Sequence, residues 1–275
     1  MDLVFGTDGV RGRVGRDIDE IKVLSLGIAS AKYLKTKKVY LGRDTRESSL
    51  ALARALTEGL NRSGIEVISL GVAPTPEIAH AAKVDNAGGA VISASHNIWS
   101  DNGVKLFGLG GLKISDAIQD LIQIDWENEQ RKNHTIKGVD LEDVNDDRWI
   151  NSLISSAKPD SFTGLSVVLD CANGATVNKA SMVFEELGAT VLEVSSNPDG
   201  KNINQNCGSN NPENLIQNRG DKTFLKKWGI TTKFFKKHYL KSKTKYNGPL
   251  NEPNVTIGYI LGLLSCKIQS IFLLY

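Results

Sequence analysis

The sequence is poor in cysteine and lacks the cysteine patterns of disulfide-rich or zinc-binding proteins. Its three cysteines, Cys171, Cys207 and Cys266, are far apart, and none belongs to a paired motif such as C-x-x-C. An odd, scattered set excludes a disulfide framework and a cysteine-rich zinc site. We therefore expect reduced thiols, which are typical of cytoplasmic proteins.

The chain also lacks a start typical of secreted proteins, and it has a single long apolar stretch. Residues 1–12 carry no apolar run behind basic residues, so we expect no secretory signal. Residues 255–275 are long enough to span a bilayer, but Lys267 lies within them and a lysine inside a span is costly to insert. A membrane anchor is therefore the weaker interpretation, and we expect a cytoplasmic protein.

The net charge is small but unevenly distributed. The 275 residues carry a formal charge of +2 and are 40% hydrophobic, which is typical of folded proteins. Residues 219–275 contain 11 basic and two acidic residues, whereas residues 1–218 contain 22 basic and 29 acidic residues. A basic tail could bind nucleic acid, but lysine clusters without a recognisable motif are usually incidental, so we expect no nucleic-acid partner.

Alternating helix and strand patterns fill the first half of the chain. Asp17 and Glu20 have the spacing of a capping box at the start of the first helix. The expected order is helix 17–35, strand 37–42, a helix that ends at Gly64, strand 65–71, helix 74–84 and strand 88–95. Short connections between such elements are typical of a three-layer α/β fold, with helices on both faces of a mixed sheet.

The remaining elements predict a second, shorter α/β unit. After strand 88–95 we expect a hairpin over 102–115, helix 115–124 and a polar linker or exposed hairpin over 125–148. Then follow helix 148–157, strand 165–170, helix 176–187 and strand 189–196. We therefore divide the chain into an α/β domain over 1–135, an incomplete second α/β domain over 136–217 and a divergent tail over 218–275.

Two loops at expected strand ends carry chemically useful side chains. They are GRDTRESS (42–49) and SASHNIWSDNG (93–103), and ligands of such sheets bind at the carboxyl ends of the strands. Ser95 could be a nucleophile with His96 as its base. A hydrolase is the weaker interpretation, because the G-x-S-x-G elbow is absent and adjacent side chains point apart. A serine- and asparagine-rich turn without chemistry is a further alternative.

A phosphate site explains more of these residues. Arg11, Arg43, Arg46 and Lys105 lie on segments expected near one sheet edge. Arginine forks bind phosphate oxygens in pairs, so these cations could hold a phosphoryl group on Ser95, with a divalent metal as further counter-charge. Taken singly, each of them is more often a solvated surface charge.

Four motifs resemble the first domain of the α-D-phosphohexomutases. They are FGTDGVRG (5–12), LGRDTRESS (41–49), PTPEIAH (74–80) and GGAVISASHNIWSDNGVKLF (88–107). A later segment, NPDGKNINQNCGSNNPENL (197–215), resembles the phosphoglucosamine mutase branch of that superfamily. The resemblance is collinear over residues 3–216.

The resemblance implies an isomerase that interconverts glucosamine 6-phosphate and glucosamine 1-phosphate, with a phosphosugar as its partner. Ser95 would be the phosphoserine, and its phosphate would contact Mg²⁺. Arg11 and Lys105 would orient phosphate or transfer protons, and His96 would position the site. The phosphate- or substrate-binding residues would be Arg43, Arg46 and Asn97.

The sequence also departs from the family pattern. Ile98 stands where the family usually has proline, so the loop loses a rigid residue. No aspartate-rich D-G-D-G-D-R segment is present, so we expect weak or absent Mg²⁺ binding and a truncated family member. The bias of residues 218–275 towards Lys, Phe, Tyr, Asn and Ile is what a frameshifted AT-rich gene would encode, and a frameshift is one interpretation of this tail. An inactive remnant, or a phosphomannomutase or phosphoglucomutase of the same superfamily, remains an alternative. The oligomeric state is left open.

Overall fold

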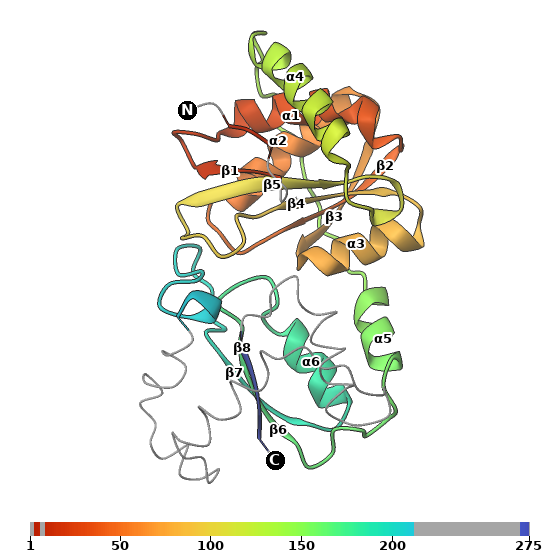
Figure 1. Ribbon diagram of the computed structural model, residues 1–275, viewed down its shortest axis with the longest axis vertical. Helices are drawn as coiled ribbons and strands as arrows, with labels where there is room; N and C mark the ends of the chain where they lie inside the picture. Colours follow the sequence, from red (N-terminus) through yellow and green to blue (C-terminus); the bar gives the residue numbers. More distant parts are fainter. Residues whose placement is uncertain (1–2, 6–8, 212–269, 275) are drawn as a thin grey trace. The chain divides into compact units, whose positions relative to one another are not determined.

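A computed structural model of the chain describes residues 3–5, 9–211 and 270–274, which fall into two units (Figure 1). Unit 1 comprises Met1–Trp149 and Asp199–Lys201, and unit 2 comprises Ile150–Pro198 and Asn202–Tyr275. The first unit therefore extends past residue 135, where we expected the first domain to end.

A five-stranded mixed sheet forms the middle layer of unit 1, with the strand order β1-β5-β4-β2-β3. β2, β3 and β4 are parallel, whereas β5 is antiparallel to both β1 and β4. The strands are β1 (Val10–Arg13), β2 (Lys38–Arg43), β3 (Glu66–Val72), β4 (Gly88–Ile92) and β5 (Asp101–Phe107).

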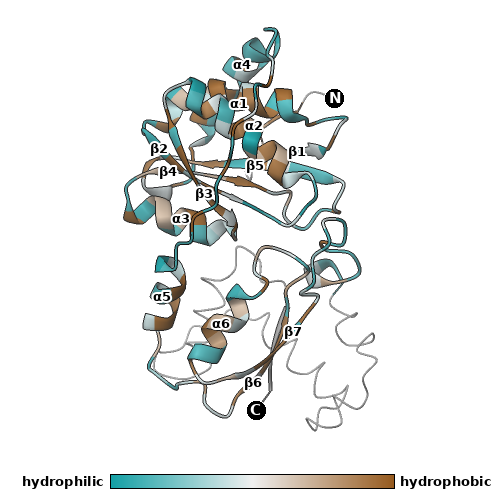
Figure 2. Ribbon diagram, turned by 180° about the vertical axis from the view of Figure 1, so that it is seen from behind, coloured by the Kyte–Doolittle hydropathy of each residue, from teal (hydrophilic) through white to brown (hydrophobic). Residues whose placement is uncertain are grey.

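Helices cover both faces of this sheet, which confirms the expected three-layer α/β fold (Figure 1). The helices on one face are α1 (Glu20–Leu34), α2 (Ser49–Arg62) and α4 (Asp116–Gln130), and the helix on the other is α3 (Thr75–Val84). Figure 2 shows both hydrophilic and hydrophobic residues on α1 and α4, as expected for helices that pack one face on a sheet.

Side chains that alternate along the strands contribute to two separate hydrophobic cores, one on each face of the sheet. Successive strand residues point to opposite faces. Val39 and Leu41 therefore join the core beneath α1, α2 and α4, where Trp126 is fully buried. Tyr40, between them, joins the core beneath α3 together with Ile78. Because both faces of the sheet are covered by apolar cores, the polar side chains of the sheet lie mainly at the ends of the strands.

The pairing of β5 differs from the hairpin that we expected over residues 102–115. β5 pairs with β4 and β1, and β1 itself was not among the expected strands. Beyond it, residues 110–115 contribute only an isolated bridge between Phe107 and Lys113. The reason is the run of glycines, because Gly110 and Gly111 both have a φ of 71°, which turns the chain out of extended geometry.

The first helix begins two residues later than the capping-box spacing suggested. Asp19, not Asp17, is its N-cap, and its Oδ1 accepts a hydrogen bond of 2.8 Å from the amide of Lys22. Asp17 instead accepts one of 3.0 Å from the amide of Arg13. The carboxylate of Asp17 therefore stabilises the turn after β1 and leaves the helix start to Asp19.

The segment expected as a linker is bonded to unit 1, and we call residues 136–147 the strap. α4 runs to Gln130, past its expected end at residue 124. The carboxylate of Glu58, which is 4% exposed, accepts the amides of residues 137 and 138 at 3.0 Å. Asp143 forms a parallel bridge with Ser69 on β3. The strap thus pairs with the outer edge of β3 at Ser69, and an edge strand is otherwise open to pairing with other chains.

Unit 2 contains a three-stranded sheet with the order β7-β6-β8. β6 and β7 are parallel, and β8 is antiparallel to β6. Its elements are α5 (Arg148–Ser155), which starts in unit 1, β6 (Ser166–Asp170), α6 (Lys179–Glu186), β7 (Thr190–Val194) and β8 (Ser270–Leu274). The first four match the expected order.

Most of the expected divergent tail lies outside the described residues, which lack 212–269 and Tyr275. The interpretation of residues 255–275 as a weak candidate for a membrane span therefore falls largely outside them as well. Within the part of the chain that the structure describes, no helix is both long enough and apolar enough to cross a membrane.

Candidate functional site

Ser95 lies in the connection between β4 and β5, and we call residues 93–100 the serine loop. The loop leaves the sheet at the edge where the parallel strands β2 and β4 end, since Arg43 and Ile92 are partners in their register. The amide of Ser93 still donates to the carbonyl of Gly103 at 2.9 Å. Ser95, two residues further on and only partly buried, therefore stands beyond the strand end.

The backbone of Ser95 has a conformation that serine rarely adopts. Its φ is 58°, in the left-handed region where a non-glycine residue is strained. Its amide donates to the Oγ of Ser93 at 3.0 Å. Ser95 is therefore a strained residue within the turn of the serine loop.

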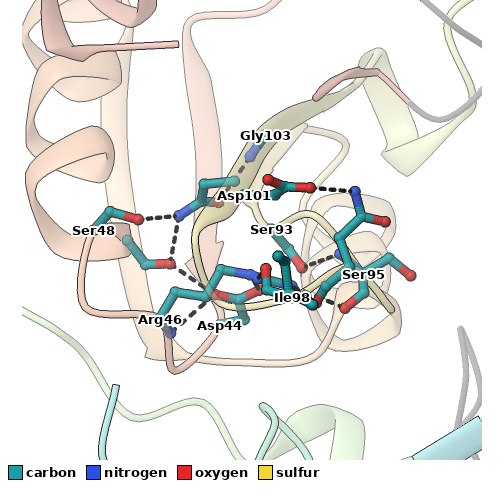
Figure 3. Close-up of polar contacts among 11 residues, drawn as sticks. Asp44, Arg46, Ser48, Ser93, Ser95, Ile98, Asp101 and Gly103 are labelled. Carbon is teal, nitrogen blue, oxygen red and sulfur yellow. Dashed lines mark hydrogen bonds and ion pairs between the residues drawn. The ribbon is translucent and has the colours of Figure 1, made fainter. Parts of the chain in front are cut away.

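Arg46 is buried beneath the serine loop. Its side chain has no exposed surface. Nη2 donates to the carbonyls of Ser95 at 3.1 Å and Asn97 at 3.0 Å, and Nη1 donates to the carbonyl of Ile98 (Figure 3). From the sequence we expected the guanidinium of Arg46 to contact a phosphate. In the structure it is bonded to the backbone carbonyls of the serine loop.

A buried polar network continues from Arg46 to the start of β5. Asp44 accepts from Nε of Arg46 at 2.8 Å and from the hydroxyl of Ser49 at 2.7 Å. Asn102 is fully buried, its Nδ2 donates to Ser49 at 3.0 Å, and its Oδ1 accepts from the amide of Gly103 at 2.8 Å. Figure 3 shows these contacts as one connected set.

Arg11 and Lys105 share the sheet face on which α3 packs. Arg11 is the register partner of Gly103, and Lys105 follows two residues later on β5, opposite Val91 of β4. Diagonal neighbours of this kind stand about 7–8 Å apart. A Cβ on Gly103 would lie 2.9 Å from Cγ of Arg11 and 3.0 Å from the carbonyl oxygen of Ser93. The Arg11 side chain therefore passes beside the first residue of the serine loop.

Arg43 lies at the same sheet edge but is engaged by the strap. Its Nη1 and Nη2 donate to the two carboxylate oxygens of Asp143 at 2.8 and 2.7 Å. This guanidinium holds the pKa of Asp143 below its usual value, and a hydrogen bond from Ser69 acts in the same direction. A phosphate that bound Arg43 through both nitrogens would have to displace Asp143, which the sequence did not predict.

Asn97 and His96 complete the loop. Nδ2 of Asn97 donates to a carboxylate oxygen of Asp101 at 2.9 Å, which joins the turn to the start of β5. Asn97 thus has a loop-closing contact, and the substrate contact that the resemblance implies stays a prediction. His96 is partly buried beside Ser95, and its positioning role stays a prediction.

The described residues do not fit the metal that the resemblance implies. Among them, no group of three or more His, Cys, Asp or Glu side chains is arranged to hold a metal ion. Near the serine loop, the carboxylate of Asp44 is bonded to Arg46 and Ser49, and that of Asp101 to Asn97. Mg²⁺ prefers an octahedron of oxygen ligands that includes carboxylates, and the described residues do not provide one.

Comparison with known proteins places these features in a family. Residues 2–133 match the family described as phosphoglucomutase/phosphomannomutase, alpha/beta/alpha domain I. A phosphoglucosamine mutase from Acinetobacter baylyi is 45% identical over 224 residues, which are 77% of this chain and 50% of that protein. One from Pelotomaculum thermopropionicum is 38% identical over 231 residues, which are 79% and 51%. The chain spans about half the length of the curated relatives it matches.

Solved structures show the same fold at lower sequence identity. A putative phosphomannomutase from Thermus thermophilus is 24% identical with a TM-score of 0.65, over 83% of this chain and 52% of that one. A phosphoglucomutase/phosphomannomutase family protein from Burkholderia thailandensis is 24% identical with a TM-score of 0.64, over 78% and 48%. Residues 2–133 are thus a domain I of the phosphoglucomutase/phosphomannomutase family, and through this domain the chain belongs to the phosphohexomutases.

Proposed function

We propose that this chain carries the phosphoserine site of a phosphoglucosamine mutase, with Ser95 as the residue that accepts and returns the phosphoryl group. The observation that carries the proposal is the position of Ser95, beyond the end of β4 in a loop bonded to buried Arg46. Phosphoryl transfer depends mainly on positioning and charge neutralisation. The identity to phosphoglucosamine mutases supports glucosamine phosphates as the substrates.

The chemistry balances without a further reactant. The Oγ of Ser95 attacks one phosphorus of glucosamine 1,6-bisphosphate, and the bond from that phosphorus to the sugar oxygen breaks. The proton of the serine hydroxyl ends on the sugar oxygen, which leaves a monophosphate and phosphoserine. The phosphoserine then transfers its phosphoryl group to the free hydroxyl of the opposite monophosphate isomer, which regenerates the bisphosphate and the serine hydroxyl. One serine thus divides the isomerisation into two displacements.

Arg11 and Lys105 are the cations that we assign to the phosphoryl group. A phosphoserine carries about −1.5 to −2 charges at neutral pH, and these two residues share one sheet face beside the serine loop. Arg11 would bind two phosphate oxygens with its fork. Lys105, a flexible point charge, would follow the group as it moves. We also propose that the protein is located in the cytoplasm.

Glucosamine 1,6-bisphosphate offered to the purified full chain tests this function. We expect intact-mass spectrometry to show the addition of one phosphoryl group, and Ser95→Ala to stay unmodified. A wild-type chain that stays unmodified would contradict the proposal and favour the inactive remnant. Inorganic phosphate that accumulates without a stable adduct would favour the hydrolase.

The same experiment with other sugars tests the substrate assignment. We expect glucose 1,6-bisphosphate and mannose 1,6-bisphosphate to modify the chain more slowly than the glucosamine compound. Faster modification by the mannose or glucose compound would favour a phosphomannomutase or a phosphoglucomutase. The Ser95→Ala variant is again the blank, because it removes the acceptor oxygen and leaves the remaining chain unchanged.

A further inference from the structure

We infer that Arg46 is a positioning residue whose guanidinium, neutralised by Asp44, fixes the backbone of the serine loop and so presents Ser95 for phosphoryl transfer. The kinetic part of this inference rests on the proposed function. The part that concerns the loop backbone does not, because it can be measured without any substrate.

Three carbonyl groups of the loop converge on one guanidinium. Arg46 donates to the carbonyls of residues 95, 97 and 98, so the chain has to curl around its planar fork. Hydrogen bonds from a charged donor are stronger than neutral ones. Lysine could not reproduce this set, because its ammonium is a compact charge without a fixed fork.

The conformation of Ser95 explains why the loop needs such an anchor. A residue other than glycine in the left-handed region persists only when its surroundings hold it there. Ser95 is held on both sides of its Cα atom, because its amide donates to Ser93 and its carbonyl accepts from Arg46. Without Arg46, the carbonyl side of this pair is lost and the loop can relax.

Burial of the charge is compensated inside the same network. The Arg46 side chain is unexposed and that of Asp44 is 5% exposed, and a buried charge is tolerated only when it is paired. Asp44 is oriented by Ser49, and Asn102 connects Ser49 to β5. The loop is thereby joined to the start of α2 and to β5, the strand that pairs with β1 and Arg11.

This arrangement separates positioning from phosphate binding. A guanidinium has five N–H donors, and four of those of Arg46 donate to Asp44 and to the loop carbonyls. A residue used in this way affects how fast Ser95 reacts and leaves the affinity for the phosphosugar unchanged. An arginine that binds the phosphate would instead change the affinity for the phosphosugar and leave the maximal rate of Ser95 phosphorylation unchanged.

The test compares Arg46→Gln and Arg46→Lys with Arg148→Lys in the full chain. Arg148 is a suitable control because its guanidinium also pairs with carboxylates, of Asp85 and Asp146, away from the serine loop. The first readout is amide hydrogen exchange, for which we expect residues 93–100 to exchange at least about tenfold faster in Arg46→Gln. We expect a smaller increase in Arg46→Lys and none in Arg148→Lys.

The second readout is the rate of Ser95 phosphorylation as a function of glucosamine 1,6-bisphosphate concentration. We expect the maximal rate to fall at least about tenfold in Arg46→Gln, with an unchanged half-saturating concentration. A raised half-saturating concentration with an unchanged maximal rate would overturn the inference and make Arg46 a phosphate ligand.

The two readouts keep the inference and the proposed function apart. If the wild-type chain is not phosphorylated, the proposed function fails, and hydrogen exchange still decides the role of Arg46. Unchanged exchange of residues 93–100 in a folded Arg46 variant would overturn the inference. If Arg46→Gln does not fold, Arg46→Lys decides, since it keeps the positive charge beside Asp44.

Discussion

Gly103 shows how closely single residues are fitted around the serine loop. A Cβ at this position would lie 2.3 Å from the carbonyl oxygen of Val10, in addition to its contacts with Arg11 and Ser93. Overpacking of this kind costs about 1–3 kcal/mol. We therefore expect Gly103→Ala to lower the free energy of unfolding by that amount in urea titrations.

Gly108→Ala is the matched control for this prediction. Gly108 has a φ of −72°, and the nearest atom to its ideal Cβ is 3.8 Å away. Its substitution should change the free energy of unfolding by less than about 0.5 kcal/mol. If Gly103→Ala and Gly108→Ala changed the free energy of unfolding equally, the close packing around Gly103 would be contradicted.

Ser95 itself offers a test of the strained backbone. Glycine adopts the left-handed region without the steric cost of a Cβ, which is about 1–2 kcal/mol per residue. Ser95→Gly should therefore be more stable than Ser95→Ala by about 1 kcal/mol, after the larger entropy of glycine in the unfolded chain is subtracted. Thermal unfolding of the two variants measures this difference, and a more stable alanine variant would place Ser95 outside the left-handed region.

Some residues of the site could be predicted from the sequence, and others could not. The sequence motifs indicated that Ser95 lies beyond a strand and that Arg11 and Lys105 lie on segments near it, whereas the roles of these three residues stay predictions. The contacts of Arg46 with the loop carbonyls were not predicted, because an arginine in a loop has the same sequence signature whether it faces a phosphate or a set of carbonyls. Asp44 and Asn102 gave no signal, since a buried polar network is defined by tertiary contacts alone.

At the scale of elements, alternating helices and strands were predictable and the unusual connections were not. Apolar periodicity located α1 to α3 and β2 to β4 within a few residues. The short strand β1 contains two arginines and a glycine, which carry no strand signal. The strap was read as a linker because it is polar, and its partners Glu58 and Ser69 are far away in sequence.

The contact between the strap and β2 should depend on pH. Arg43 holds the pKa of Asp143 below its usual value, and a carboxyl with a lowered folded-state pKa stabilises the fold above its unfolded-state pKa of about 3.9. That contribution is lost as the pH falls through the folded-state value. Asp143→Asn should therefore be less stable than the wild type at pH 7, and the difference should vanish well below pH 4.

Urea titrations of both proteins at neutral and acidic pH measure this difference. Many other carboxyl groups also titrate in acid, so the quantity of interest is the difference between wild type and variant rather than either midpoint. A difference that stays constant from neutral to acidic pH would show that Asp143 contributes through packing and not through its charge.

At the scale of the whole molecule, we expect a single phosphorylation of Ser95 but no measurable repeated turnover. The chain spans about half the length of its curated relatives, and its described residues provide no cluster of metal ligands. Loss of one charge-stabilising group typically costs roughly 10²–10³ in rate, and incomplete positioning of the sugar adds to this. A coupled assay of glucosamine 6-phosphate and glucosamine 1-phosphate interconversion should therefore not distinguish the wild type from Ser95→Ala.

Turnover that disappears in Ser95→Ala would contradict this expectation. It would show that this chain, or a second copy of it, supplies the groups that we find missing among the described residues. Host mutase carried through purification is excluded by the same comparison, because it would contribute equally to both preparations.

The most direct test of the central claim is to locate the phosphoryl group within the chain. Cleavage after Lys83 and Lys105 releases residues 84–105, a peptide that contains Ser93, Ser95 and Ser100. After incubation with glucosamine 1,6-bisphosphate, fragmentation of this peptide in the mass spectrometer should place the phosphoryl group on Ser95. A phosphoryl group on Ser93 or Ser100, or an unmodified peptide, would contradict the assignment of Ser95 as the phosphoryl acceptor.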